Sequence, residues 1–124
     1  MEPLLIYETE VTPKIEFYPD GNLFIEGRSL PIDSIGFYNP IIKWVNEISA
    51  PVINLLIRME YMNTSSAKQL YTIMILLKEN VQVKSLNINW YYEEDDNDGH
   101  DTGLEFETLI DTPFRFYAYS EEVF

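Results

Sequence analysis

Alternating apolar and polar residues organise the middle of the chain. In residues 54–62, and again in residues 86–92, apolar side chains occupy every second position. A period of two is typical of strands that bury one face, and we expect these two strands to be parallel neighbours. Between them, residues 64–79 carry apolar side chains three and four positions apart. This spacing predicts a helix that packs on one face of the sheet.

The same pattern predicts a hairpin near the start of the chain. Residues 13–18 and 23–25 alternate as strands on either side of Asp20-Gly21, which is a strong hairpin turn. Residues 6–12 are apolar and then polar, and we expect them to form a short edge strand or an arm.

A helix is predicted between the hairpin and the first long strand. The strand pattern breaks over residues 27–31, after which Asp33 or Ser34 is expected to cap a helix. Pro40 lies inside this helix and lacks the N–H that the helical ladder needs, so it should bend the first turns or delay the helix start. Pro51 ends this region.

The last third of the chain is predicted to contain a loop, a helix and a strand. Residues 93–101 form an acidic, solvated loop, and the third helix is expected to be capped near Asp101 or Thr102. Residues 114–118 form the last strand. The resulting order is β-β-α-β-α-β-α-β, an α/β fold with a mixed sheet, about three helices and parallel crossovers in its second half. Residues 1–124 are expected to be a single domain.

Composition excludes several classes of function. The chain has no cysteine, so it has no disulfide or thiolate nucleophile, and its single histidine excludes a zinc site built on several histidines. That residue, His100, has no nucleophile placed beside it by the sequence. A net charge of -13 argues against nucleic acid and anionic membranes. The start lacks a signal peptide and no segment is long enough to span a bilayer, so we expect a cytoplasmic protein without cofactors.

Four small polar residues stand where the first long strand meets its helix: Asn63, Thr64, Ser65 and Ser66. One interpretation is a helix N-cap, for which Ser66 with Gln69 also has capping-box spacing. The other is a phosphorylation site on Thr64 or a neighbouring serine. The two are compatible, because a helix N-terminus attracts anions through its free N–H groups and its dipole.

The acidic segment partly matches the pattern of a calcium-binding loop. Counted from Glu94, Asp96, Asp98 and Glu105 occupy ligand positions of a twelve-residue calcium loop, and Gly99 stands at its glycine position. However, the first position is glutamate rather than aspartate, the eighth is Asp101 instead of an aliphatic residue, and a strand rather than a helix precedes the loop. The prediction is therefore that no metal binds here.

Several motifs together resemble a known family. They are Trp44-Val45, Tyr61-Met62-Asn63-Thr64-Ser65-Ser66, Asn89-Trp90-Tyr91-Tyr92 followed by Glu93-Glu94-Asp95-Asp96, and Pro113-Phe114. With this set of motifs spread along nearly its whole length, the chain resembles the SiaC family of bacterial regulatory phosphoproteins, whose fold is like that of the anti-sigma-factor antagonists (STAS-like). The segment Gly99-His100-Asp101 departs from the family's usual sequence.

The resemblance implies a function in signal transduction without enzymatic activity. Members are phosphorylated on the threonine of the Asn-Thr-Ser-Ser element by a dedicated serine/threonine kinase and dephosphorylated by a PP2C-type phosphatase. The unphosphorylated form binds and activates a diguanylate cyclase, and so controls cyclic-di-GMP and biofilm formation. Carried over, Thr64 is the phosphoacceptor, with Asn63, Ser65 and Ser66 flanking it.

Two alternatives remain at this point. Anti-sigma-factor antagonists carry Asp-Ser-Ser-Gly at the same junction, so the chain could use this switch on another target, although Asn63 replaces the aspartate and Ser66 the glycine. A small calcium-binding or hydrolytic protein that uses the acidic segment is the alternative from a different class.

Overall fold

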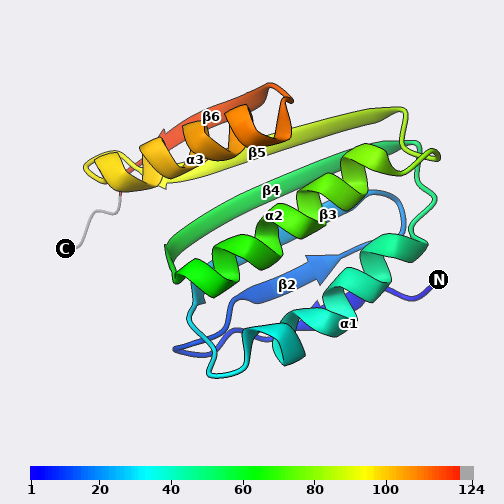
Figure 1. The fold of residues 1–124 in the computed structure, drawn as a ribbon, viewed down its shortest axis with the longest axis horizontal. Helices are drawn as coiled ribbons and strands as arrows, with labels where there is room; N and C mark the ends of the chain where they lie inside the picture. The colour runs from blue at the N-terminus through cyan, green and yellow to red at the C-terminus, as the bar shows by residue number, and fades with distance from the viewer. Residues whose placement is uncertain (121–124) are drawn as a thin grey trace.

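Six strands form one sheet and three helices lie on one of its faces in the computed structural model, which describes residues 1–120 (Figure 1). The elements in chain order are β1 (Leu4–Ile6), β2 (Lys14–Phe17), β3 (Asn22–Ser29), α1 (Ser34–Glu47), β4 (Val52–Met62), α2 (Thr64–Glu79), β5 (Ser85–Glu93), α3 (Asn97–Ile110) and β6 (Phe114–Tyr119). None of the helices in this described part is long and apolar enough to cross a membrane.

The strands lie in the sheet in the same order as in the chain. Strands β1, β2 and β3 pair antiparallel, whereas β3–β4, β4–β5 and β5–β6 pair parallel. The predicted parallel pairing of β4 with β5 is therefore confirmed, as is the mixed α/β fold. Each parallel connection contains one helix, and right-handed crossovers that all step in the same direction place their helices on the same side. Figure 1 shows this two-layer arrangement.

The core lies between the sheet and the three helices. Alternate residues of the strands point into it, as the period of two predicts, and the helices contribute residues spaced three and four apart. Its fully buried members include Ile15, Phe17, Leu23, Ile25, Ile41, Val45, Ile53, Leu55, Ile57, Ile73, Met74 and Leu77. The three helices therefore cover one face of the sheet and leave the other without a helix (Figure 1).

The first edge strand differs from its prediction. A strand or arm was expected over residues 6–12, but β1 is Leu4–Ile6, and Thr9 to Thr12 forms a hydrogen-bonded turn. The earlier position follows from pairing, because Leu4 and Ile6 stand opposite Phe17 and Ile15 of β2. The sheet thus has one more strand than the predicted order.

Strand β3 is also longer than the sequence pattern indicates. The predicted break over residues 27–31 is wrong, because β3 continues to Ser29 through a register shift between Gly27 and Arg28. Gly27 has a φ of 116°, a conformation that favours glycine, so the strand absorbs the irregularity and keeps pairing with β4. Asp33 then caps α1, which starts at Ser34 without the delay that Pro40 could have caused.

Helix α3 begins earlier than predicted. A loop was expected up to residue 101, but the helix starts at Asn97, and Asp96 is its N-cap. The Asp96 carboxylate accepts a hydrogen bond from the Gly99 N–H at 2.9 Å, and the Trp90 indole N–H donates to the Gly99 carbonyl at 3.0 Å. These two bonds stabilise a first turn whose residues have low helix propensity.

Candidate functional site at the start of helix α2

The junction between β4 and α2 forms a helix cap at the carboxyl end of the sheet. Asn63 is the N-cap of α2, and its side-chain oxygen accepts the Ser66 N–H at 2.9 Å. The same oxygen accepts the Ser65 hydroxyl at 3.2 Å. The cap interpretation of this segment is therefore correct, but Asn63 rather than Ser66 performs it, because Ser66 already lies inside the first turn.

The four polar residues differ sharply in exposure. Thr64 and Ser65 are exposed and Asn63 is half-buried, whereas the side chain of Ser66 is only 1% exposed. Within residues 1–120 the Thr64 hydroxyl forms no hydrogen bond. The side-chain oxygen of Asn63 accepts the Ser65 hydroxyl and the Ser66 N–H instead. A phosphate donor could thus reach Thr64 or Ser65 in the folded protein, but not Ser66.

Ser66 belongs to a buried chain of hydroxyl groups. Its Oγ accepts a hydrogen bond from Ser29 Oγ at 2.7 Å, and Ser29 Oγ lies 2.7 Å from Tyr38 Oη. All three side chains are buried, so β3, α1 and α2 meet at this chain. Sequence reasoning missed Ser29 and Tyr38. Ser29 fell in the presumed break after β3, and the apolar spacing of Tyr38, Ile41 and Val45 was the available signal for Tyr38.

Burial raises the pKa of the Tyr38 hydroxyl above its ordinary value of 10.0, although the Ser29 and Ser66 hydroxyls act in the opposite direction. The folded state therefore keeps this proton at a pH where the unfolded chain loses it. The protonated Tyr38 hydroxyl therefore contributes to the free energy of unfolding below about pH 10, and this contribution is lost as the pH rises through the folded-state pKa.

We expect the Tyr38→Phe variant to lose less stability than the wild type between about pH 9 and pH 11, because it lacks this titration. At neutral pH it should be less stable by about 1 kcal/mol, the usual net contribution of one hydrogen bond. Chemical denaturation over this pH series measures both effects. Parallel stability curves for the two proteins would contradict the assignment.

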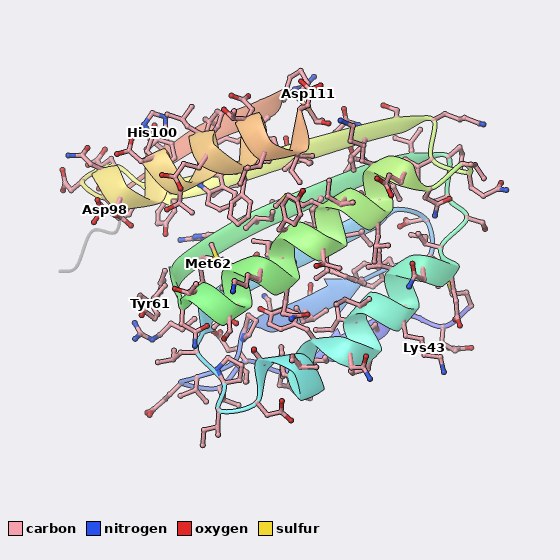
Figure 2. The ribbon with its side chains drawn as sticks, in the orientation of Figure 1. Lys43, Tyr61, Met62, Asp98, His100 and Asp111 are labelled. Atoms are coloured by element: carbon pink, nitrogen blue, oxygen red, sulfur yellow. The ribbon has the colours of Figure 1, made fainter. Side chains whose placement is uncertain are left out.

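Two hollows adjoin this junction. The first, of about 310 Å³, lies at the carboxyl ends of β4 and β5 and the start of α3, and is lined by Met59 to Met62, Trp90 to Tyr92, Asp96, Asp98, Gly99 and Thr102. Figure 2 shows Tyr61, Met62 and Asp98 at this end of the sheet. The second hollow, of about 300 Å³, lies between α2 and α3. Thr102 lines both, so the two are adjacent.

The second hollow is largely apolar, and we call it the α2–α3 groove. Its walls consist of Thr64, Ala67, Lys68 and Tyr71 of α2 and Thr102, Glu105, Phe106 and Leu109 of α3. Tyr71 is 37% exposed and Leu109 is 64% exposed, so both offer apolar surface to solvent at this groove. Thr64, as the first residue of α2, stands at one end of this groove.

A phosphate on Thr64 would interact favourably with helix α2 but unfavourably with the acidic residues around it. The N-terminus of α2 carries unpaired N–H groups and the positive end of the helix dipole, and Lys68 lies one turn further along. Across the groove, α3 presents Glu105, and Asp98 lines the adjacent hollow. A phosphate at Thr64 would therefore suit α2 but would add negative charge to a surface that is already acidic.

The acidic segment does not have the shape of a calcium loop. The ligand positions Asp98 to Glu105 lie within α3, and the Asp96 carboxylate is engaged as its N-cap. These residues cannot wrap around one ion while they are helical. Carboxylate oxygens of Glu93, Glu94 and Asp95 lie within 4.8 Å of one another, but Glu93 already accepts the Asp95 N–H, and exposed acidic groups are common without a metal.

His100 also occupies a different place from the one predicted. Instead of lying in a loop, it is part of α3, where it stacks on Tyr92 at 4.5 Å between ring centroids. Its ring also lies nearly perpendicular to the ring of Phe116, with centroids 5.5 Å apart. These contacts give the histidine a packing role.

Comparison with known proteins agrees with this arrangement. Residues 6–119 match the model of the SiaC family regulatory phosphoproteins. An uncharacterized protein of Pseudomonas aeruginosa (strain UCBPP-PA14) is 30% identical over 126 residues, which cover 98% of this chain and 100% of the relative.

Solved structures are similar over nearly the whole chain. The crystal structure of apo-SiaC from Pseudomonas aeruginosa is 31% identical, with a TM-score of 0.84, and the match covers 95% of this chain and 100% of that one. In a crystal structure of the diguanylate cyclase SiaD in complex with its activator SiaC, from the same organism, the matching chain is 30% identical with a TM-score of 0.85; 94% of this chain and 99% of that chain are covered. The chain described here therefore belongs to the SiaC family of regulatory phosphoproteins.

Proposed function

We propose that this protein is a partner-switching phosphoprotein without enzymatic activity, whose phosphoacceptor is Thr64. Its unphosphorylated form binds and activates a diguanylate cyclase, and phosphorylation releases that partner. A serine/threonine kinase adds the phosphate and a PP2C-type phosphatase removes it. The protein thereby controls cyclic-di-GMP synthesis.

The observation that carries this proposal is the position of Thr64. Its hydroxyl is exposed and free of hydrogen bonds within residues 1–120, at the first position of α2 and at one end of the α2–α3 groove. A modification there changes the charge beside an apolar surface without touching the core. Further support comes from the similar SiaC chain that was crystallised with the cyclase it activates.

Magnitudes decide how the phosphate acts. It adds about 1.5–2 negative charges, and at a helix N-terminus it should stabilise the helix by about 0.3–1 kcal/mol. Burying the same dianion against a partner without matched cations costs several kcal/mol. Because the second term is larger, the phosphate should expel the partner while the fold stays intact. A kinase or phosphatase, by contrast, can offer cations or metals to the phosphate.

We expect Thr64→Ala to bind and activate the cyclase like the wild type and to resist the kinase. Thr64→Asp should weaken binding by about tenfold or more, equivalent to about 1.4 kcal/mol, and full phosphorylation should weaken it further because it adds more charge. Cyclase affinity, the rate of cyclic-di-GMP synthesis and the melting temperature are the measurements.

Asn39→Asp is the matched control, because it adds one charge at an exposed position of α1. It should leave cyclase affinity unchanged, and Ser65→Ala should still be phosphorylated. Unchanged affinity after phosphorylation of Thr64, or unfolding of the domain by the phosphate, would contradict the proposal.

A further inference from the structure

Three hydroxyl side chains follow one another at the start of α2, and two of them are already engaged. The Ser66 hydroxyl is buried and accepts a hydrogen bond from Ser29. The Ser65 hydroxyl is exposed but donates to the side-chain oxygen of Asn63 at 3.2 Å. Thr64 is exposed as well, and its hydroxyl has no hydrogen-bond partner within residues 1–120. In this described part, Thr64 alone of the three is therefore both accessible and unengaged.

Asn63 is itself held in place before it receives the Ser65 hydroxyl. Its backbone N–H donates to the Ser29 carbonyl at 2.9 Å, which attaches this residue to the end of β3. Its side-chain oxygen accepts the Ser66 N–H at 2.9 Å, as the N-cap of α2. The Ser65 hydroxyl thus meets an acceptor whose position is already determined by two other hydrogen bonds.

Phosphoryl transfer to a hydroxyl group requires its proton to leave. The hydroxyl oxygen forms a bond to the γ-phosphorus of a nucleoside triphosphate, while the bond from that phosphorus to the departing nucleoside diphosphate breaks. The proton passes to a base of the kinase, which has to lie within hydrogen-bond reach of it. A hydroxyl that donates to a neutral amide oxygen points its proton away from such a base. It has to break this hydrogen bond before it can react.

We propose that Asn63 is a specificity-determining residue, which holds the Ser65 hydroxyl and thereby directs phosphorylation to Thr64. This inference rests on the proposed function, because it presupposes a kinase that acts on this element. Asn63 engages Ser65, burial excludes Ser66, and Thr64 keeps a free hydroxyl beside the α2–α3 groove. The substrate protein itself thus contributes to the choice of its phosphorylated residue.

The choice between the two exposed hydroxyls matters for the switch. Thr64 lines the α2–α3 groove, whereas Ser65 is not among the lining residues of that groove. Successive side chains of a helix point about 100° apart around its axis. A phosphate on Ser65 would therefore place its charge away from the apolar surface that a phosphate on Thr64 adjoins.

Site mapping in a background with two serines tests the inference. Thr64→Ser gives the kinase the same chemical group at both exposed positions, so a general preference for serine or threonine no longer contributes. With ATP and the kinase that phosphorylates the wild-type chain, tandem mass spectrometry should find the phosphate at position 64. Adding Asn63→Ala should raise the ratio of phosphate on Ser65 to phosphate at position 64 about fivefold, the effect of losing one hydrogen bond.

Two further variants separate this role from a merely structural one. Asn63→Asp retains an acceptor for Ser65, and a carboxylate accepts more strongly than an amide, so the phosphate should stay at position 64. Ser29→Ala removes the hydrogen bond to Ser66 but leaves the Asn63 side chain and its bonds in place. It should loosen the start of α2 without changing the phosphate distribution. Circular dichroism checks that each variant is folded.

A second measurement does not involve the kinase. NMR couplings between the α- and β-protons of Ser65 report whether its side chain keeps one rotamer. The wild type and Asn63→Asp should show one dominant rotamer, whereas Asn63→Ala should show averaging over several. This measurement is independent of where the kinase acts.

An unchanged phosphate distribution in Asn63→Ala would overturn the inference, because the direction of the side chains on the helix would then decide the site. Equal shifts towards Ser65 in Asn63→Ala and Ser29→Ala would overturn it too, as would rotamer averaging of Ser65 in the wild type. The proposed function fails on a different result: a protein phosphorylated on Thr64 that keeps its cyclase affinity would contradict the switch and leave the site selection intact. Phosphate on neither Thr64 nor Ser65 would overturn both.

Discussion

A carboxylate introduced by Ser66→Asp should destabilise the protein by about 3–5 kcal/mol, the usual cost of an uncompensated buried charge. Ser66 is 1% exposed, and its hydroxyl accepts a hydrogen bond from Ser29. The hydroxyls of Ser29 and Tyr38 that lie in the same buried chain are neutral, so they cannot offset the negative charge of the aspartate. This loss is a large fraction of the total stability of about 5–15 kcal/mol of a typical domain, so the variant should melt at a clearly lower temperature.

The measurement is chemical and thermal denaturation beside Thr64→Asp and Ser65→Asp, which place the same charge on the two exposed neighbours. Both controls should change the free energy of unfolding by less than about 1 kcal/mol. The change should be a gain, because a negative charge at a helix N-terminus interacts favourably with the helix dipole. The three variants therefore separate two exposed positions from a buried structural one within three consecutive residues. A stable Ser66→Asp protein would show that the hydroxyl chain is not a fixed part of the fold.

Trp90→Ala should destabilise the protein by about 3–5 kcal/mol, as expected when a large buried aromatic side chain is removed. Trp90 is 3% exposed, and its ring lies 5.6 Å from the ring of Phe106. Its indole N–H also holds the first turn of α3 through the Gly99 carbonyl. A Cβ at Gly103 would lie 2.7 Å from Trp90 ring atoms, so α3 approaches this ring as closely as it can.

Because Trp90 links β5 to α3, its loss should be local as well as global. Amide hydrogen exchange should accelerate first in α3, before the central strands β3 and β4 respond. Tyr91→Ala is the control, since the next residue points to the helix-free face and is only half-buried. We expect it to cost about 1 kcal/mol, the centre of the range for single substitutions. Equal losses in the two variants would contradict the role of Trp90 as the anchor of α3.

The sequence predicted the central elements because their signals are local. The alternation in residues 54–62 and 86–92 and the helical spacing that follows fall within β4, β5 and α2. The start of α2 at Thr64 was also predictable, because polar residues between two clear periodicities mark a boundary. The parallel pairing of β4 and β5 followed from the helix that connects them.

The errors arose where distant residues decide the local conformation. Strand β3 passes through Gly27 because β4 offers a continuous pairing partner, and β1 is placed by its pairing with β2. Helix α3 begins at Asn97 because the Asp96 cap and Trp90 hold a turn that is poor in helix formers. Propensity alone favoured a loop, and tertiary contacts prevailed.

The candidate site divides in the same way. The sequence by itself determined that Thr64 stands at a strand–helix junction, where a helix N-terminus suits an anion. Only the tertiary structure decided that Thr64 is exposed while Ser66 is buried against Ser29 and Tyr38. Periodicity records which side of its own element a residue occupies, but exposure and proximity depend on which other elements pack against that side.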